Sequence, residues 1–257
     1  MDTILEVKNV SKKYQSLKGE IQALENVNFR VKQGEFTSII GPSGCGKSTL
    51  LSIISGLEPK SEGKIYIQGR EVDGISSDVG YMLQKDCLLE WRSIWNNVML
   101  GLELKGINTV QSKEYAKNLL IKYNLYDFKD KYPSELSGGM RQRVALIRTL
   151  AVNPKILLLD EAFSALDYQT RIMVTNDIYG ILKKENITPI IVTHDISEAI
   201  SMSDKVLVLS KRPGTIKDIH KIDFEIDNRN PINCRESPKF SKYFNTLWKE
   251  LSDYENT

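Results

Sequence analysis

The sequence predicts an α/β fold built on a parallel sheet with crossover helices. In the second half of the chain, short apolar runs alternate with helical stretches, an order that is typical of such a sheet. The helical stretches span 168–184 and 196–202. The apolar runs have the length of buried strands and lie at 155–159, 189–193 and 205–209. The class α/β therefore follows from order and length alone.

Residues 1–84 are expected to form mostly strands and turns, including an antiparallel β element near the N-terminus. Val27, Phe29 and Val31 alternate with polar residues, as in a strand that buries one face. Glycines separate the next apolar runs in the manner of turns. These further strands are expected at 36–40, 64–67 and 79–83.

A helical subdomain is expected at about 85–152. Val144, Ile147 and Ala151 recur there at helical spacing, and Pro154 follows their helix. This region separates the N-terminal strands from the alternating half of the chain.

The end of the chain is more polar. A short strand is expected at 222–226 and a terminal helix around 240–251, while His220 matches no motif and is expected at the surface. We therefore expect one domain over 1–257. It divides into a core at about 1–84 and 153–215, the helical subdomain at about 85–152 and a tail at about 216–257.

Composition narrows the class of protein. Hydrophobic residues make up 41% of the chain, which is too much for a disordered protein. The net charge of +2 gives no reason to expect a nucleic-acid partner. Cys45, Cys87 and Cys234 form neither a disulfide framework nor a zinc pattern. No apolar run approaches the ~20 residues of a membrane-spanning helix, and the start does not look like a signal peptide. Work at a membrane would therefore need a partner.

A glycine-rich loop follows the strand expected at 36–40. It reads Gly41-Pro42-Ser43-Gly44-Cys45-Gly46-Lys47-Ser48-Thr49 and fits the phosphate-binding pattern G-x-x-x-x-G-K-[ST]. Its N–H groups would surround phosphate oxygens, Lys47 would reach the β and γ phosphates, and Ser48 would ligate Mg²⁺. The alternative is a chance glycine-rich turn. The preceding strand and the apolar helix face that follows favour nucleotide binding in a P-loop core.

A second part of such a site follows the strand expected at 155–159. This strand would deliver Asp160 to the Mg²⁺ shell, and Glu161 would polarise a water for attack on the γ phosphate. Two acids after an apolar strand are usually only a strand end. The glycine-rich loop upstream favours the catalytic interpretation.

The segment Leu136-Ser-Gly-Gly-Met-Arg-Gln-Arg143 contains another anion cradle, with Ser137, Gly138 and Gly139 at a helix start. One chain with one nucleotide loop has no obvious need for two. With this segment the sequence resembles the ATP-binding subunits of ABC transporters. The resemblance implies that the cradle contacts the γ phosphate of ATP held by the opposite subunit, and hence an ATP-dependent homodimer.

The resemblance also implies roles for four single residues. Tyr14 would stack on adenine, and Gln84 would contact Mg²⁺ and the attacking water. Asp167 belongs to the Ser164-Ala-Leu-Asp167 loop that crosses the dimer seam. His194 would contact the γ phosphate and orient the water. Taken alone, an exposed Tyr, a surface Gln or a structural His is the ordinary alternative.

Several segments are similar to the nitrate, sulfonate and taurine importers within this family. They are 88–92, 97–104, Met140, 209–216 and the tail 229–251. Glu90 stands where that subfamily commonly has Pro. The similarity implies an integral membrane permease, an extracytoplasmic substrate-binding protein and a location at the cytoplasmic face of the cell membrane, without nucleic acid.

Two other classes of ABC ATPase are alternatives to the importer. One acts on nucleic acid or ribosomes, but it usually carries two nucleotide domains, a coiled coil or zinc modules. The other powers an exporter, and the loop around Trp91 and the tail argue against it. On the same loop, Leu88, Leu89 and Trp91 would either dock a permease or pack inside the helical subdomain. Arg141, Arg143 and Arg148 are expected on a solvated helix face with local pairing.

Overall fold

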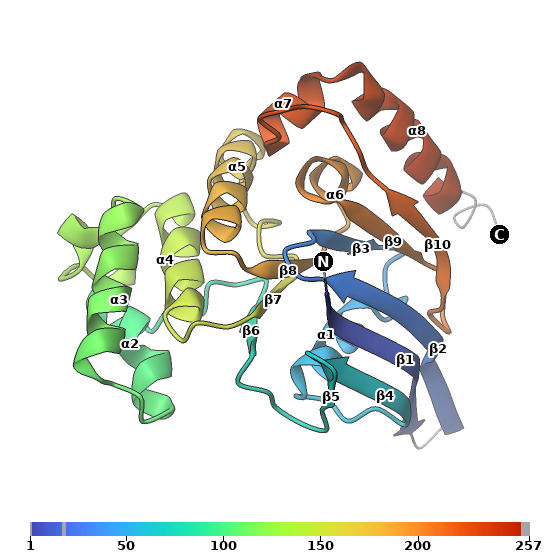
Figure 1. Cartoon of the computed structure of the whole chain (residues 1–257), viewed down its shortest axis with the longest axis horizontal. Helices are drawn as coiled ribbons and strands as arrows, with labels where there is room; N and C mark the ends of the chain where they lie inside the picture. The colour runs from blue at the N-terminus through green and yellow to red at the C-terminus, as the bar shows by residue number, and fades with distance from the viewer. Residues whose placement is uncertain (1, 17–18, 253–257) are drawn as a thin grey trace.

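Two sheets and eight α-helices make up the part of the chain that the computed structural model describes, residues 2–16 and 19–252 (Figure 1). The larger sheet has six strands, and five of them run parallel. In order across the sheet they are β10 (Ile216–Lys221), β9 (Lys205–Leu209), β3 (Thr37–Ile40), β8 (Thr188–Val192), β7 (Ile156–Asp160) and β6 (Val79–Met82). The prediction of a parallel sheet is confirmed.

The edge strand of this sheet differs from the expectation. β10 pairs antiparallel with β9 over Ile216–Lys221, whereas residues 222–226 form no strand. The reason lies in the register, because Lys221 pairs with Lys205, the first residue of β9. Beyond Lys221 the chain has no strand left to pair with. The apolar side chains of Ile222 and Phe224 are instead buried in a cluster between the sheet and the helices that follow it.

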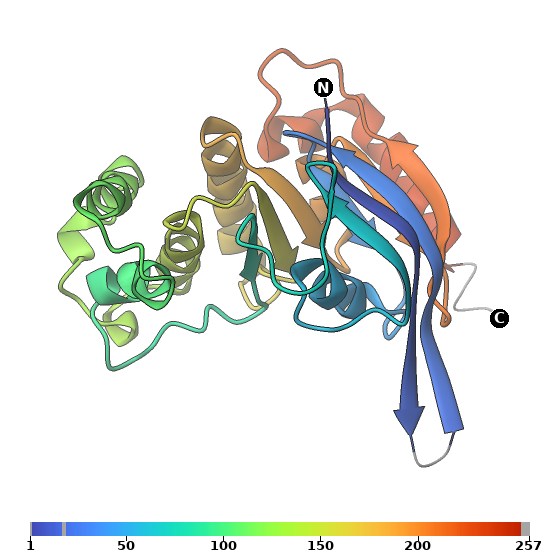
Figure 2. The same ribbon diagram turned by 60° about the horizontal axis from the view of Figure 1, so that its bottom comes forward.

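The smaller sheet is antiparallel. Its strands, in order, are β2 (Gly19–Lys32), β1 (Thr3–Ser16), β4 (Glu62–Ile67) and β5 (Arg70–Glu71). Val27, Phe29 and Val31 of β2 are buried, as their alternation predicts. β1 and β2 form a long two-stranded ribbon that extends beyond the rest of the molecule (Figure 2). This sheet is the predicted antiparallel element.

Helix α1 (Lys47–Ser55) joins the two sheets into one core. Its residues Leu50, Leu51 and Ile54 share a buried cluster with Val7 of β1 and Leu158 of β7. Gly56 ends the helix in a left-handed conformation with φ 79°. The helix therefore starts at the glycine-rich loop and is anchored by apolar contacts on both sides.

Three helices lie together on one side of the large sheet (Figure 1), and we call them the helical lobe. They are α2 (Ile94–Leu104), α3 (Val110–Lys122) and α4 (Gly138–Leu150). Ser93 caps α2, and Thr109 caps α3 by accepting from the N–H of Ser112. Two short 3₁₀ turns connect α3 with α4, at Tyr126–Phe128 and Pro133–Glu135.

The remaining helices are α5 (Tyr168–Lys184), α6 (Ile196–Met202), α7 (Pro231–Glu236) and α8 (Pro238–Ser252). The expected terminal helix is confirmed as α8. His220 does not stand free at the surface as expected. It is half-buried, with its Nε2 3.0 Å from an oxygen of Glu250, so it ties β10 to α8.

The carboxylate of Glu185, at the C-terminal end of α5, links that helix to the helical lobe. It accepts from Lys122 Nζ at 2.5 Å, Tyr123 OH at 2.6 Å and Tyr115 OH at 3.4 Å. Burial opposes the charged form, but the hydrogen bonds from Lys122 and Tyr123 outweigh it, so the pKa of Glu185 lies below its ordinary value of 4.5. Burial and the neighbouring carboxylate raise the pKa of Tyr115 to about 12.

We expect Glu185→Gln to lower the free energy of unfolding at pH 7 by about 1–2 kcal/mol, because it removes a charged acceptor of three donors. A depressed carboxyl pKa stabilises the fold above the unfolded-state pKa, and this stabilisation is lost as pH falls through the folded-state value. The difference from the wild-type chain should therefore shrink below about pH 4.5. Urea unfolding from pH 7 to pH 3.5 measures it, and a pH-independent difference would contradict the assignment.

Candidate active site

The predicted site residues follow strands that end at one edge of the large sheet. The glycine-rich loop follows β3, Asp160 and Glu161 stand at the end of β7, His194 follows β8, and Gln84 follows β6. These strands are parallel neighbours, so their carboxyl ends lie side by side. Ligands of open α/β sheets bind at this edge.

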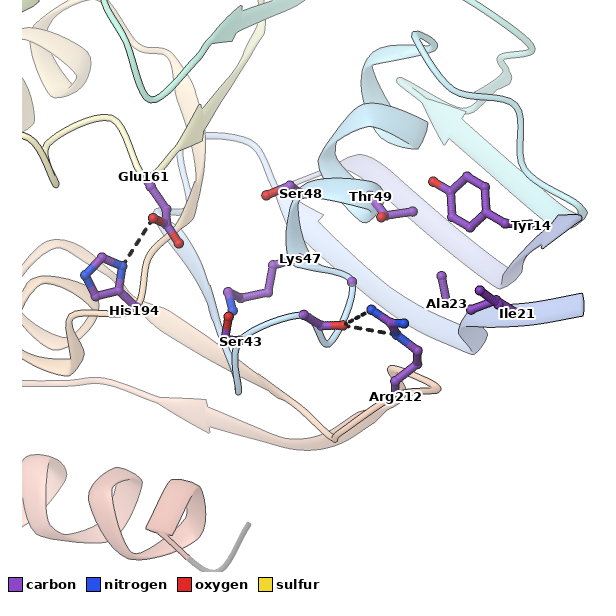
Figure 3. Close-up of a pocket in the computed structure, with 12 residues that line it drawn as sticks. Tyr14, Ile21, Ala23, Ser43, Lys47, Ser48, Thr49, Glu161, His194 and Arg212 are labelled. Carbon is purple, nitrogen blue, oxygen red and sulfur yellow. Dashed lines mark hydrogen bonds and ion pairs between the residues drawn. The ribbon is translucent and has the colours of Figure 1, made fainter. Parts of the chain in front are cut away.

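A cavity of about 620 Å³ opens at this edge (Figure 3). Tyr14 and Ala23 of the β1–β2 ribbon lie toward one end, and Glu161 and His194 lie at the other. The residues that line it are Tyr14, Ile21, Ala23, Ser43, Gly44, Gly46, Lys47, Ser48, Thr49, Glu161, His194 and Arg212. Nine of these twelve belong to the set predicted from the sequence; Ile21, Ala23 and Arg212 do not.

Close backbone packing explains the glycines of the loop. A Cβ at Gly46 would lie 2.7 Å from Leu24 Cδ2, and the φ of 106° there disfavours any other residue. A Cβ at Gly41 would lie 2.9 Å from the carbonyl oxygen of Leu209. The Lys47 ammonium folds over the loop and donates to the Gly41 carbonyl at 2.8 Å. The N–H groups at the start of α1 are thus available to an anion.

Gly41, Pro42 and Cys45 of the loop are not among the residues that line this cavity. Cys45 is buried, and burial raises the pKa of its thiol above the ordinary value. A neutral buried thiol is a packing group.

Asp160 is held through both of its carboxylate oxygens. Ser48 Oγ donates to Oδ1 at 3.0 Å, and Tyr81 OH donates to Oδ2 at 3.0 Å. Burial and the Asp160 charge raise the pKa of Tyr81 to about 12, so the phenol stays a donor. The oxygen atoms of Ser48 and Asp160 are of the kind that Mg²⁺ prefers. The donor set therefore fits a magnesium ion beside the loop.

Glu161 has a left-handed backbone, with φ 47°. Its N–H donates to the carbonyl of Val192 at 2.9 Å, which ties this turn to the neighbouring strand β8. His194 Nδ1 lies 3.3 Å from Glu161 Oε2. A carboxylate and an imidazole thus face the end of the cavity beyond Lys47 (Figure 3). Backbone strain of this kind concentrates at functional sites.

Gln84 does not line the cavity. Its Nε2 donates to Ser164 Oγ at 3.1 Å, and Ser164 Oγ donates to the carbonyl of Glu161 at 2.9 Å. A single hydroxyl therefore connects the segment after β6 with the turn that carries Glu161.

The predicted second anion cradle also lies outside the cavity. Ser137 caps α4 by accepting from the Met140 N–H. Gly138 and Gly139 pack against the start of α5, where a Cβ at Gly139 would meet Val174 at 3.0 Å. Asp167 caps α5 and accepts from the N–H of Thr170 at 3.1 Å. One chain thus forms the cavity without any of these four residues.

Two arginines of α4 hold the segment after Gln84. Arg141 contacts Asp86 at 2.8 Å and Glu90 at 2.7 Å, and Arg148 donates to the backbone carbonyls of Asp86 and Cys87. Burial opposes the charged Asp86 carboxylate, but Arg141 outweighs it and lowers the pKa of Asp86. The expected local pairing is confirmed. The expected solvated face is wrong, because these side chains are half-buried.

The three apolar residues of the loop around Trp91 do not share one environment, although both alternatives from the sequence treated them as a group. Trp91 is 75% exposed, so it does not pack inside the helical lobe. Leu88 is 6% exposed and belongs to the buried cluster of that lobe, so it is not part of an exposed patch. Leu89 is half-buried. One large aromatic side chain therefore remains exposed on this loop.

Sequence reasoning missed Tyr81 and Arg212. Tyr81 lies two residues into β6, and its partner Asp160 is 79 positions away. Arg212 follows β9 in the segment 209–216, which marked a subfamily but carried no assigned chemistry. Its proximity to the cavity depends on the position of β9 next to β3. Both residues reach the site through the order of the strands in the sheet, which no local pattern of the sequence shows.

Comparison with known proteins identifies the family. The ABC transporter family matches residues 24–164, which is more than half of the chain. The chain therefore belongs to the ABC transporter family, and it is an ATP-binding ATPase of that family.

Relatives extend the similarity over nearly the whole chain. An uncharacterised ABC transporter ATP-binding protein of Bacillus subtilis, YtlC, is 48% identical over 98% of this chain and 97% of its own. The nitrate import ATP-binding protein NrtD of Synechocystis is 38% identical, over 93% of this chain and 91% of its own. The aliphatic sulfonates import ATP-binding protein SsuB of Bacillus cereus is 41% identical, over 88% of this chain and 86% of its own.

Solved structures agree with the family. The dimeric ABC transporter cassette MJ0796 superposes with a TM-score of 0.73 and 33% identity, over 86% of this chain and 99% of its own. Its post-hydrolysis state bound to ADP and Pi gives a TM-score of 0.72 at the same identity and the same coverage. Among the helices of the described residues, none has the length and apolar character needed to cross a membrane.

We expect Tyr81→Phe to lower the free energy of unfolding by about 1–2 kcal/mol, since the Asp160 carboxylate loses one of its two donors. Chemical unfolding in EDTA measures this loss. Tyr66→Phe is the matched control, because no hydrogen bond of its hydroxyl is found among the described residues. Equal losses in the two variants would mean that the bond to Asp160 contributes nothing.

Proposed function

We propose that this chain is the ATP-hydrolysing subunit of an ABC importer for a small solute of the nitrate, sulfonate or taurine type. The import proteins among its relatives support this proposal, with 38–41% identity over 88–93% of the chain. The exposed Trp91 loop and the tail, which the sequence shares with that subfamily, support it further. The ATPase would work at the cytoplasmic face of the cell membrane, together with an integral permease and an extracytoplasmic substrate-binding protein.

The proposed active unit is a head-to-tail homodimer with ATP between the subunits. The observation that carries this is the position of Ser137, Gly138 and Gly139 outside the cavity of their own chain. Ser137 and Gly138 are exposed at the start of α4, and the N-terminus of a helix favours an anion. In the dimer it would meet the γ phosphate of ATP on the partner, with Asp167 at the seam.

Nucleotide binding is proposed to follow the shape of the cavity. Tyr14 would stack on the base, the loop from Gly41 to Thr49 would surround the phosphates, and Lys47 would contact the β and γ phosphates. Ser48, Asp160 and Gln84 are the residues proposed to hold Mg²⁺. When bound, the ion would supply charge neutralisation of the phosphate oxygens.

The chemical step is proposed to use the residues at the far end of the cavity. Glu161 would accept a proton from the attacking water, and His194, 3.3 Å away, would hold the carboxylate and the water in place. Gln84 would report the bound state, since its contact with Ser164 leads to the turn of Glu161. Arg141 and Arg148 would pass movement of this segment to α4.

We expect Glu161→Gln to keep ATP binding and to lower turnover about 10²–10⁴-fold, because the variant cannot accept the proton. Steady-state phosphate release and nucleotide titration measure the two quantities. Asp127→Asn, which changes an exposed acid outside the site, is the control. Near-normal turnover would contradict the role of Glu161.

The same variant tests assembly and transport. With ATP trapped, Glu161→Gln should shift from monomer to dimer mass, and adding Ser137→Arg should abolish the shift. A monomer at saturating ATP would contradict the dimer. Host cells that carry only Glu161→Gln should lose uptake of one of labelled nitrate, taurine or an alkanesulfonate. Unchanged uptake of all three would contradict the importer assignment.

We expect Trp91→Ala to weaken association with the permease while the isolated subunit keeps its stability and ATP affinity, because Trp91 is 75% exposed on the segment that joins Gln84 to the helical lobe. Ile75→Ala removes a similarly exposed apolar side chain away from the helical lobe and is the control. Co-purification of the assembled transporter and uptake measure the effect. Unchanged co-purification would contradict the docking role.

A further inference from the structure

Arg212 lines the cavity but has no place in the function proposed so far. Its Nη2 and Nε donate to the carbonyl of Gly44 at 3.0 and 3.3 Å (Figure 3). The guanidinium is thus fixed to the backbone of the phosphate-binding loop, on the cavity side. A guanidinium has five N–H donors, so donors remain for a ligand.

The charge of Arg212 has no acidic partner among the described residues, and the same holds for Lys47. The 22 ion pairs recorded for residues 2–16 and 19–252 include neither side chain. Glu161 is the acid that lines the cavity, and it lies at the other end (Figure 3). Two positive side chains without acidic partners, beside a glycine-rich loop, favour a ligand that carries several negative charges.

The order of strands decides which part of the ligand Arg212 faces. Arg212 follows β9, whereas His194 and Glu161 follow β8 and β7 on the opposite side of β3. Arg212 therefore lies on the side of the loop toward Ala23 and Tyr14, away from the end where hydrolysis is proposed (Figure 3).

The loop that carries Arg212 is held in place by backbone contacts. The Gly214 N–H donates to the Ala23 carbonyl at 2.9 Å, and the Glu25 N–H donates to the Gly214 carbonyl at 3.0 Å. A Cβ at Gly214 would lie 2.2 Å from the carbonyl oxygen of Cys45, so the loop packs directly on the phosphate-binding loop. The position of Arg212 is consequently built into the core and needs no ligand to form.

We propose that Arg212 is a further nucleotide-binding residue whose guanidinium contacts the phosphate nearest the ribose in both ATP and ADP. This inference rests on the proposed ATP site. Because the contact is remote from the γ phosphate, it stabilises substrate, transition state and product alike. Uniform binding of this kind changes KM and the nucleotide Kd but leaves kcat unaltered.

The test compares Arg212→Ala with Lys211→Ala. Lys211 is a neighbouring exposed cation that does not line this cavity. In Arg212→Ala we expect Kd to rise about tenfold for both ADP and a non-hydrolysable ATP analogue, as for a lost charged hydrogen bond. KM should rise by the same factor, and kcat should change less than twofold. Lys211→Ala should leave all values within twofold.

Arg212→Gln separates ligand contact from bracing of the loop. Gln still has a donor for the Gly44 carbonyl but carries no charge. If Arg212 binds phosphate, Gln fails to restore affinity, and the dependence of Kd on salt becomes weaker than in the wild type. Restored affinity in Arg212→Gln would overturn the proposal in favour of bracing.

Two further results would also overturn it. They are an unchanged Kd in Arg212→Ala, and a loss for the ATP analogue without a loss for ADP. If the wild-type protein binds and hydrolyses ATP, and Arg212→Ala has the same nucleotide affinity, only this inference is rejected. Wild-type protein that binds neither nucleotide would instead reject the proposed function.

Discussion

The site depends on one constraint, the alignment of five parallel strands at their carboxyl ends. β3 is the middle of this arrangement, buried between β8 and β9, and the phosphate-binding loop can leave it only at that edge. Across the edge, the strand order β9-β3-β8-β7-β6 presents Arg212, the loop, His194, Glu161 and Gln84 in turn. The sequence order of these residues is different. The sheet therefore brings residues that are distant in sequence into one row. In this row the cations Arg212 and Lys47 lie beside the loop, and the Glu161 carboxylate lies beyond it.

Within this row, backbone shape sets the chemistry more than side-chain packing does. Gly41 and Gly46 have no room for a Cβ, and Glu161 holds a left-handed conformation that its N–H bond to Val192 supports. Such positions cost stability locally, and they persist when the surroundings determine them. The surroundings here are the apolar cluster that α1 shares with both sheets. The core thus holds the loop in the conformation that these positions require.

The sequence predicted the parts of the site that are local in the chain. The glycine-rich loop and the acids after β7 carry their chemistry within a few residues, and the strand before each is recognisable by its apolar run. The sequence did not predict contacts in which a site residue finds its partner on another strand or helix. Tyr81, Arg212 and the contacts of Arg141 depend on neighbours that only the sheet order brings close. The strand expected at 222–226 failed for the same reason, because apolar composition cannot show that β9 offers no further partner.

Ser137 lies outside the cavity, but the segment after Gln84 connects its helix, α4, with the turn that carries Glu161. One end of this segment bonds to Ser164, whose hydroxyl bonds to the turn of Glu161, and the other end is held by Arg141 and Arg148 of α4. The same α4 begins at Ser137. The Gln84 end is therefore fixed by a side-chain hydrogen bond, and the other end is fixed by the stronger charge-assisted hydrogen bonds of the two arginines. Glu90, the residue that departs from the subfamily's usual Pro, adds a further contact between this segment and α4 through Arg141.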